Sequence, residues 1–301
     1  MTAPTHPPHA PEGEERARPG APTSTTRSAL PGLRVAPASL RLVPAAVPAT
    51  AADLPTGRPG AQHRRGRRSA DELRAIVEEA APRLADASAQ EVAAWAAEEF
   101  DEWLAVACSM ADAVLPHLVA QAATARGAAT VDVLFLDTGY HFAETLATRD
   151  LVAARLPVRV VDVVPRLSVA EQDAAHGVDL FARDPGACCR MRKVEPLTEQ
   201  LAGYEAWVTG VRRDEAPTRA GTPVVTWDAA HGLVKINPLA AWTFDELLAY
   251  AAEHDVPLNP LLDDGYPSIG CRPCTSRVAP GADPRSGRWA GLAKTECGIH
   301  P

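Results

Sequence analysis

The sequence predicts an α/β fold, a mainly parallel, doubly wound sheet that is followed by a mobile C-terminal tail. From residue 103 onward, short apolar runs alternate with segments of helical periodicity. Two of these runs, 131–136 and 158–164, are apolar almost throughout, as expected of strands that are buried on both faces. Such alternation of strands and helices implies parallel strands with helices on both sides of the sheet. The tail carries Cys297, a thiol four residues from the last residue, where a side chain has little packing role.

Length and composition limit the classes of protein to which the chain can belong. With 301 residues, 46% of them hydrophobic, it can bury one large core or two small ones. A net charge of −8 argues against binding nucleic acid through bulk charge. No apolar run reaches the ~20 residues of a membrane span, and the first residues lack the apolar core of a signal peptide. Six cysteines without an export signal predict reduced thiols and a cytoplasmic location.

Residues 1–68 differ in composition from the rest of the chain. They hold 12 of the 28 prolines and are rich in alanine and arginine, with no sustained periodicity. They carry ten arginines and four acidic residues, so the remaining residues bear a net charge of −14. We expect this N-terminal extension to be disordered and residues 69–301 to form the folded domain. The basic run 63–68 is expected to be a solvated linker, with contact to nucleic acid or a membrane surface as the alternative.

The elements of the folded domain follow from capping signals and periodicity. Ser-x-x-Glu boxes at Ser69 and Ser88 begin the first two helices, and Thr243 with Glu246 caps the last one. Between them lie apolar runs of strand length. We predict, in order, helices at 69–80 and 88–100, a strand at 104–108, a helix at 111–125, a strand at 131–136, a helix at 141–156, a strand at 158–164, a helix at 191–201, strands at 206–209, 224–227 and 234–236, and a helix at 243–252.

Three loops that directly follow predicted strands carry polar residues suited to a nucleotide, and the second and third also carry a glycine. They span 108–112, 137–141 and 209–214. Ligands of doubly wound sheets bind at the carboxyl ends of the strands, where such loops meet. Glycines there allow the backbone to approach a flat ligand closely. The candidate contacts in these loops are Ser109, Thr138, Gly139, Gly210, Arg212 and Arg213.

The first of these loops, from Cys108 to Asp112, contains no glycine. Pyrophosphate cradles use several glycines, because backbone N–H groups must surround the phosphates. A nucleotide with only an α-phosphate would fit this loop better than one with a β,γ-diphosphate. Cys108 itself ends an apolar strand and is expected to be a buried packing residue.

Four further cysteines form two pairs, the adjacent Cys188 and Cys189 and the spaced Cys271 and Cys274. Thiolates in such numbers hold either zinc or an iron–sulfur cluster. Paired zinc ligands are usually separated by two or more residues, whereas the iron atoms of a cluster are far enough apart for adjacent cysteines. The adjacent pair therefore favours [4Fe–4S], with zinc as the alternative.

Positive side chains surround both cysteine pairs in a domain that is otherwise acidic. A cluster bound by four thiolates is anionic, so cations are expected near it. The same cations would suit an anionic substrate. The basic residues near the pairs are Arg190, Arg192, Lys193, Arg272, Arg277, Arg285 and Arg288.

Six segments of the folded domain carry more specific sequence motifs. They are LFLDTGYHF (134–142), CCRMRKVEPL (188–197), WVTGVRR (207–213), GYPSIGCRPC (265–274), RSGRW (285–289) and ECGIH (296–300). Together they resemble the assimilatory sulfonucleotide reductases, and among these the adenylyl-sulfate (APS) reductase branch of actinobacterial type. The resemblance covers about residues 70–301. The paired cysteines combined with the terminal Glu-Cys-Gly-x-His sequence are its most specific part.

This resemblance implies an adenine nucleotide alpha hydrolase-like fold. It also implies the reduction of adenosine 5′-phosphosulfate (APS) to sulfite and AMP, with thioredoxin as the electron donor, in sulfate assimilation and cysteine biosynthesis. The nucleophile would be Cys297, in a catalytic tail of about 285–301. The first strand-end loop departs from the Ser-Phe-Ser-Gly-Gly/Ala pattern of the wider family at Ser109–Asp112.

The resemblance further assigns roles to individual residues. One [4Fe–4S] cluster per chain would be bound by Cys188, Cys189, Cys271 and Cys274. The phosphosulfate would be contacted by Lys193, Arg285 and Arg288. Apart from the resemblance, the chemistry of histidine suggests that His300 would stabilise the closed tail or protonate a leaving group, with a plain contact of the tail as the alternative.

The residues also suggest a reaction sequence for such an enzyme. The Cys297 thiolate would attack the sulfur of APS, AMP would leave, and a Cys297 S-sulfonate would remain. A thioredoxin thiol would then attack Cys297 and release sulfite. We expect the cluster to act structurally and electrostatically, because the thiols supply both electrons.

Three other functions remain open at this point. A reductase of 3′-phosphoadenylyl sulfate (PAPS) is the nearest alternative, and no residue here decides whether a 3′-phosphate is accepted. An ATP-dependent tRNA thiolation enzyme of related fold is disfavoured by the glycine-poor first loop and the tail cysteine. A zinc-stabilised nucleic-acid-binding module is disfavoured by the charge of −14 on the folded domain.

Overall fold

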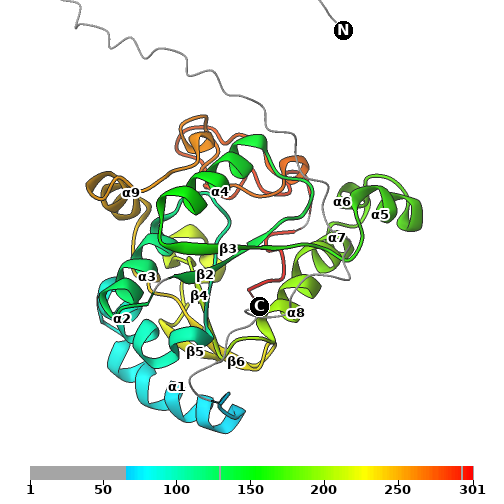
Figure 1. Cartoon of the computed structure of the whole chain (residues 1–301). Coiled ribbons are helices and arrows are strands. Elements are labelled where there is room, and N and C mark those ends of the chain that lie inside the picture. The colour runs from blue at the N-terminus through cyan, green and yellow to red at the C-terminus, as the bar shows by residue number, and fades with distance from the viewer. Residues whose placement is uncertain (1–65, 129, 293, 301) are drawn as a thin grey trace, which may run out of the picture. The chain divides into compact units, whose positions relative to one another are not determined.

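A six-stranded sheet forms the centre of the computed structural model, with the strand order β3-β2-β1-β4-β6-β5 (Figure 1). Every neighbouring pair of strands is parallel except β5 and β6, which are antiparallel. The predicted mainly parallel sheet is therefore confirmed. The strands are β1 (Leu104–Ala107), β2 (Val131–Leu136), β3 (Val158–Val163), β4 (Ala206–Thr209), β5 (Val225–Asp228) and β6 (Leu233–Ile236).

The structure describes residues 66–128, 130–292 and 294–300. Of the predicted disordered extension, 1–68, residues 1–65 lie outside the described residues, so their disorder stays a prediction. At its described end the prediction is wrong, because Arg67 donates to Ala202 O and Tyr204 O and Arg68 pairs with Glu99 and Glu205. No helix of the described residues is long and apolar enough to cross a membrane.

The longer helices begin where the sequence places their caps. Ser69, Ser88 and Thr243 each accept a hydrogen bond from the backbone N–H three residues later, and each capping box is complete. The helices of eight or more residues are α1 (Ala70–Leu84), α2 (Ala89–Phe100), α3 (Val114–Ala125), α4 (Ala143–Arg155), α5 (Val169–His176) and α9 (Phe244–Glu253). The shorter ones are α6 (Leu180–Arg183), α7 (Pro185–Cys189) and α8 (Glu195–Leu201).

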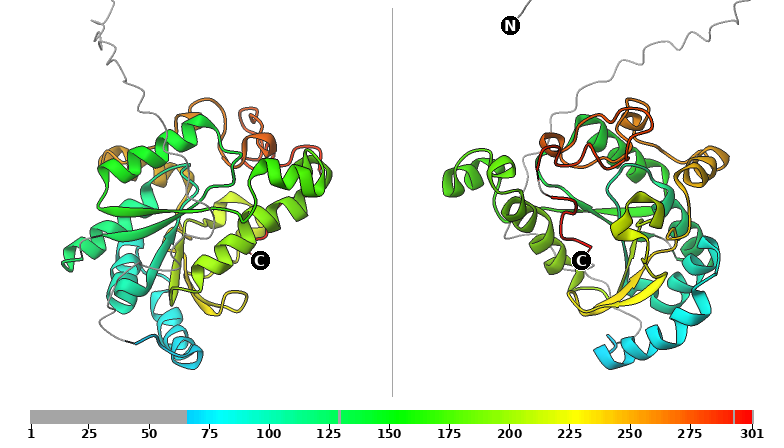
Figure 2. Two further views of the ribbon diagram at one scale, coloured as in Figure 1. Left: turned by 45° about the vertical axis from the view of Figure 1, so that its right-hand side comes forward. Right: turned by 180° about the vertical axis from the view of Figure 1, so that it is seen from behind.

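Helices cover both faces of the sheet, as predicted. In β2, Val133 and Phe135 pack into a large core that includes residues of α1–α3 and α9, whereas Leu134 between them packs into a smaller core with α8. Figure 2 shows the last part of the chain, in red, running between α8 and the sheet. Ile299 of that segment packs against the smaller core.

The region before residue 202 differs most from the prediction. Instead of one helix at 191–201, α7 ends at Cys189, a five-residue π-helical segment spans Arg190–Val194, and α8 follows. The prediction placed the cysteine pair before the helix. In the structure both cysteines lie in α7, whose N-cap is Asp184, with its carboxylate accepting from Ala187 N. Wide turns of this kind inside helices occur mostly at functional sites.

Two helices, α5 and α6, were not predicted. Helix α5 starts with a complete capping box of Ser168 and Glu171, so a signal was present. Only Gln172 of this helix is buried, so no apolar periodicity supports it.

The helix predicted at 111–125 begins three residues later than expected, at Val114. Asp112 forms an isolated antiparallel bridge with Leu258, which keeps the backbone extended. Its carboxylate accepts the backbone N–H of Val114 at 3.0 Å. A long-range contact therefore decides where this helix starts.

Candidate active site

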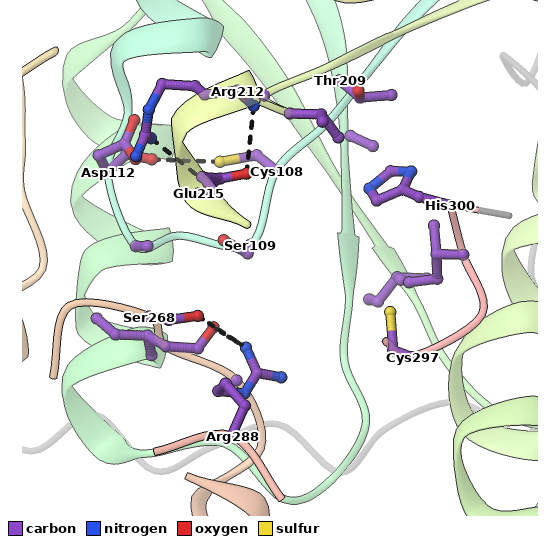
Figure 3. Close-up of a pocket in the computed structure, with 18 of the residues that line it drawn as sticks. Cys108, Ser109, Asp112, Thr209, Arg212, Glu215, Ser268, Arg288, Cys297 and His300 are labelled. Atoms are coloured by element: carbon purple, nitrogen blue, oxygen red, sulfur yellow. Dashed lines mark hydrogen bonds and ion pairs between the residues drawn. The ribbon is translucent and has the colours of Figure 1, made fainter. Parts of the chain in front are cut away.

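A cavity of about 240 Å³, here called the main cavity, lies at the carboxyl ends of β1, β2 and β4 (Figure 3). The last residues of these strands, Ala107, Leu136 and Thr209, all line it. Because the strands are parallel, the loops that follow them meet at one edge of the sheet. Much of the remaining wall comes from the last part of the chain, including the terminal segment, residues 294–300. The strand-end loops therefore enclose a cavity where the sequence predicts a ligand site.

Most of the predicted site residues line the main cavity. Figure 3 shows Cys297 and His300 on one side of it, across from Ser109. The lining residues that the sequence singled out are Ser109, Lys193, Gly210, Arg212, Cys271, Arg285, Arg288, Cys297 and His300.

Three predicted contacts, Thr138, Gly139 and Arg213, are not among the lining residues. Arg213 donates from Nε to the backbone oxygen of Thr222 at 2.9 Å. Thr138 is fully buried, and its Oγ1 lies 3.2 Å from Sγ of Cys271. The loop after β2 therefore faces the cysteines more than the main cavity.

Arg288 reaches the main cavity across Gly270. Its Nη1 donates to the backbone oxygen of Ile269 at 3.2 Å and to Ser268 Oγ at 3.4 Å. A Cβ on residue 270 would lie 2.1 Å from Nη2 of Arg288, so only glycine leaves room for the guanidinium. Among the described residues, the buried Nε of Arg288 has no hydrogen-bond partner. This guanidinium therefore keeps a donor for an anion.

Arg212, by contrast, is already paired. It is buried, and its guanidinium meets Asp214 at 3.0 Å and Glu215 at 3.5 Å. The ring of Phe244 lies 5.4 Å from its central carbon. Two carboxylates neutralise this arginine, which leaves it better suited to shaping the cavity wall than to binding a charged ligand.

Lys193 lies between two cavities. It lines the main cavity and also a smaller one, here called the cysteine pocket, which contains the four paired cysteines. Burial lowers the pKa of Lys193, but the nearby thiols of Cys271 and Cys297 raise it, and the net shift is upward. Its ammonium is therefore a cation that contacts both sites.

The cysteine pocket brings together thiols that are far apart in the sequence. It is lined by Tyr140, Phe181, Pro185, Cys188, Cys189, Arg192, Lys193, Cys271, Pro273, Cys274 and Trp289. Burial and, to a lesser degree, the neighbouring Cys189 together raise the pKa of Cys188 to about 12. Burial together with Cys271 raises the pKa of Cys274 to about 11. Buried thiols crowded in this way are suited to binding a metal, which takes up their negative charge.

The arrangement of these thiols bears on which metal group they fit. Four sulfur ligands share one small pocket, which matches the donor set of an iron–sulfur cluster. Among the described residues, no three His, Cys, Asp or Glu side chains are placed to hold a single metal ion. The pocket thus supplies the four sulfur ligands that either a cluster or a zinc ion would need.

The terminal segment is bound on both sides of Cys297. Before it, Glu296 forms ion pairs with Arg219 and Arg285, each at 3.0 Å. After it, His300 stacks on Trp207, with ring centroids 5.6 Å apart and an interplanar angle of 24°. Gly298 has φ +88°, a left-handed conformation that turns the chain between these two contacts. Cys297 is thereby held at the wall of the main cavity with its thiol partly exposed.

Five charged or thiol residues of the cavity wall were missed as site residues in the sequence. They are Cys108, Asp112, Glu215, Arg219 and Glu296. Burial and the nearby Asp112 raise the pKa of Cys108 to about 12, so this thiol stays protonated. It is only partly buried and lines the main cavity, whereas the sequence predicted a buried packing residue. Cys108, Asp112 and Glu215 lie in or next to loops that the sequence did single out. Arg219 had no such signal, because its partner Glu296 is 77 residues away.

Comparisons with known proteins agree with this site. A family model described as the phosphoadenosine phosphosulfate reductase domain matches residues 102–277. An adenosine 5′-phosphosulfate reductase of Mycolicibacterium smegmatis is 59% identical over 230 residues, which cover 76% of this chain and 95% of the relative. A protein of the same name from Streptomyces coelicolor is 54% identical over 233 residues, 77% of this chain and 97% of the relative.

A solved structure supports the fold. The crystal structure of phosphoadenylyl-sulfate (PAPS) reductase from Candida auris, in a phosphate complex, is similar with a TM-score of 0.55 and 30% identity. The match covers 67% of this chain and 96% of that one. With the parallel sheet order, this similarity makes the fold adenine nucleotide alpha hydrolase-like, as the sequence motifs implied. By its family model, its relatives and its fold, the chain belongs to the phosphoadenosine phosphosulfate reductase family.

Proposed function

We propose that this protein is an adenylyl-sulfate reductase, which reduces APS to sulfite and AMP with electrons from thioredoxin. The observation that carries the proposal is the position of Cys297 in the wall of the main cavity, together with Lys193, Arg285 and Arg288. A thiol among three cations is suited to attack an anionic, electrophilic sulfur. The relatives with 50–59% identity are all named adenosine 5′-phosphosulfate reductases, which supports the same substrate.

In the proposed first step, the Cys297 thiolate attacks the sulfur atom of APS. A new S–S bond forms, the bond between sulfur and the bridging phosphate oxygen breaks, and AMP leaves with that electron pair. The product is a Cys297 S-sulfonate. Both electrons that reduce the sulfur come later from thioredoxin, so no electron needs to pass through another group in this step.

In the second step, a thioredoxin thiolate attacks Sγ of Cys297. Sulfite leaves with the bonding electron pair, and a mixed disulfide joins the two proteins. The second thiol of thioredoxin then attacks the mixed disulfide, which releases Cys297 as a thiol and oxidised thioredoxin. Cys297 must therefore meet a small nucleotide first and a protein afterwards.

The cations give the first step its electrostatic advantage. A thiolate and a sulfate group repel each other, and positive charge placed at both lowers this repulsion in the transition state. Lys193 lies near Cys297 and Cys271, and Arg288 has a buried donor without a partner among the described residues. Fixed positions of these groups add the benefit of orientation.

The nucleotide part of APS would lie against the loops after β1 and β4. Ser109 and Gly210 line this part of the main cavity, between apolar side chains such as Leu115 and Phe244. The loop after β1 has no glycine, so its backbone cannot wrap around a phosphate as closely as a pyrophosphate cradle does. This suits a substrate whose only phosphate is the α-phosphate.

We also propose that one [4Fe–4S] cluster is bound in the cysteine pocket, by Cys188, Cys189, Cys271 and Cys274. When bound, such a cluster would hold the segment after α7 against the chain around residue 271 and would add negative charge close to Lys193. Arg192 supports the same junction, since it donates from Nη1 to Leu167 O and to Gln172 Oε1. The six cysteines are all free thiols. Because the proposed reaction and the cluster both need reduced thiols, we propose a cytoplasmic location.

PAPS reduction is the second candidate, because a relative of known structure, at 30% identity, is described as a PAPS reductase. The two substrates differ only by a 3′-phosphate. The relatives named for APS are far more similar, at up to 59% identity over 95% of their length. We therefore rank APS first.

The direct test is incubation of anaerobically purified protein with radiolabelled APS, without thioredoxin, followed by intact-mass analysis. We expect one added sulfonate on Cys297, which thioredoxin releases as sulfite. An adduct with PAPS but not with APS would move the assignment to the second candidate. No adduct with either nucleotide would overturn the proposed function.

A further inference from the structure

A carboxylate next to the proposed nucleophile is shared by two arginines from different parts of the chain. Arg219 donates from Nε to Oε1 of Glu296 and from Nη2 to Oε2, both at 3.0 Å. Arg285 reaches only Oε2, also at 3.0 Å, and donates to the backbone oxygen of Thr295 at 2.9 Å. Arg219 therefore makes the two-point contact that fixes the orientation of a carboxylate, whereas Arg285 makes a one-point contact.

The two arginines differ in how much negative charge surrounds them. Arg219 is also paired with Glu215, so it faces two carboxylates. Arg285 has only a share of Glu296, and its pKa is lowered by burial and by the adjacent Arg219. For Arg219, burial lowers the pKa, but Glu296 and Glu215 raise it above its usual value. A further anion in the cavity would thus be stabilised beside Arg285, while Arg219 is already neutralised.

The pKa of Glu296 also indicates that this carboxylate is bound mainly by Arg219. Burial raises the pKa of this carboxyl, but the hydrogen bond and the charge of Arg219 outweigh burial, and the pKa lies below its usual range. Thr218 adds a weak hydrogen bond at 3.4 Å. Glu296 would therefore stay ionised and bound to Arg219 even when Arg285 turns to another anion.

We infer that Arg219 is a positioning residue that holds Cys297 in the main cavity through Glu296, while Arg285 is left to bind the anionic substrate. Substrate can then enter beside Arg285 without opening the terminal segment. The segment is released for the protein reductant only when the pair of Arg219 and Glu296 breaks. The inference rests on the proposed function for the identity of the substrate and the reductant. The docking of Cys297 itself depends only on contacts that exist in the protein without substrate.

The test measures access to Cys297 without any substrate. The free protein is treated with iodoacetamide, and the rate of alkylation at Cys297 is followed by peptide mass. Loss of a two-point, charge-assisted contact is expected to raise this rate about tenfold in Arg219→Gln and equally in Glu296→Gln. The double variant should show no further rise in the alkylation rate, because both changes break the same contact between Arg219 and Glu296. Glu296→Gln lies in the terminal segment, so it tests the contact even if Arg219→Gln folds poorly.

Two further variants separate the roles of the arginines. Arg285→Gln should weaken APS binding, measured by calorimetry, but leave the alkylation rate of Cys297 within about twofold of wild type. Arg219→Gln should keep APS binding and slow the formation of the S-sulfonate at saturating APS. Arg155→Gln breaks an exposed ion pair with Asp255, and neither residue lines the main cavity, so this variant serves as the control with wild-type alkylation.

Unchanged alkylation in Glu296→Gln would overturn the inference, and so would an equal rise in Arg285→Gln and Arg219→Gln. Neither result depends on the reaction catalysed. Failure of the proposed function would instead appear as the lack of any nucleotide adduct in wild-type protein, with the alkylation results unaffected.

Discussion

Trp207 and His300, 93 residues apart in the chain, stack in the centre of the protein with an interplanar angle of 24°. The indole N–H of Trp207 donates to Asp228 Oδ2 at 3.1 Å, which fixes the ring that supports the histidine. Lys235 Nζ lies 5.2 Å from the centroid of the same indole ring. The docking of the C-terminal end thus depends on a platform built from β4, β5 and β6.

Docking of His300 should depend on pH. Burial, together with the charges of Lys235 and Arg219, lowers the pKa of His300 well below its ordinary value of 6.5, and the opposing charge of Asp228 does not outweigh them. Neutral histidine therefore docks. Its contribution is complete above the pKa of the free tail, ~6.5, and is lost progressively as the pH falls below that value. The alkylation rate of Cys297, divided by that of a synthetic peptide of residues 294–300, should rise on acidification.

The matched control for this pH effect is His300→Phe, which keeps an aromatic ring over Trp207 but cannot be protonated. Its normalised alkylation rate should not vary between about pH 5 and pH 8. If wild type and this variant show the same pH dependence, the proton that matters is not on His300.

The Cys297→Ser variant should lose turnover by at least about 10³-fold, because a serine hydroxyl is a far weaker nucleophile at neutral pH. APS binding should stay within a few-fold of wild type, since the cations and the strand-end loops are unchanged. Sulfite production assays and calorimetry check the two parts. Sulfite production at the wild-type rate would contradict the proposed nucleophile.

Substitution Cys271→Ala should remove one of the four thiols of the cysteine pocket. We expect loss of bound iron, loss of brown absorbance and loss of most activity, as measured by metal analysis, visible spectra and sulfite assays. Cys108→Ala is the control, because this thiol lines the main cavity and not the cysteine pocket, and its iron content should equal that of wild type. A fully active, iron-free Cys271→Ala protein would refute the cluster assignment.

Arg192→Met should destabilise the fold. The side chain of Arg192 is 3% exposed and donates to Thr138 O, Leu167 O and Gln172 Oε1. Removing it leaves buried acceptors without a donor, which we expect to cost roughly 2–4 kcal/mol in the free energy of unfolding. Urea denaturation under anaerobic conditions measures this, with iron content determined in parallel.

The control for Arg192 is Arg166→Met, which breaks an ion pair of a 79% exposed arginine with Glu199. The change in free energy of unfolding there should be below ~1 kcal/mol. Equal stability of the two variants would mean that Arg192 does not tie the loop after β2 to the segment after α7.

Much of the fold was predictable because its signals are local. The box of Ser88 and Glu91 is complete within four residues, and the run 131–136 is apolar enough to be read as a buried strand. The start of α3 was not predictable in the same way, because Leu258 holds Asp112 in an extended bridge. Helix α5 was missed because a capping box without an apolar face is a weak signal.

In the candidate site, too, local motifs predicted some residues correctly, whereas contacts between distant segments were not predictable. The strand-end loops and the motifs pointed to Ser109 and Cys297, and both line the main cavity. The sequence also placed Thr138 among the nucleotide contacts, whereas its hydroxyl lies beside Cys271, 133 residues away. A loop motif places a residue near a strand end but does not say which neighbour its side chain meets.

By itself, the sequence determined the parallel α/β class, the cysteine pairs and the terminal thiol, because hydrophobic periodicity, capping and ligand spacing act over a few residues. Only the tertiary structure decided that Glu296 meets Arg219, that His300 lies on Trp207, and that Lys193 stands between the main cavity and the cysteine pocket. These contacts join distant segments, and their geometry depends on how strands and helices pack into one body. Local patterns carry no information about that packing.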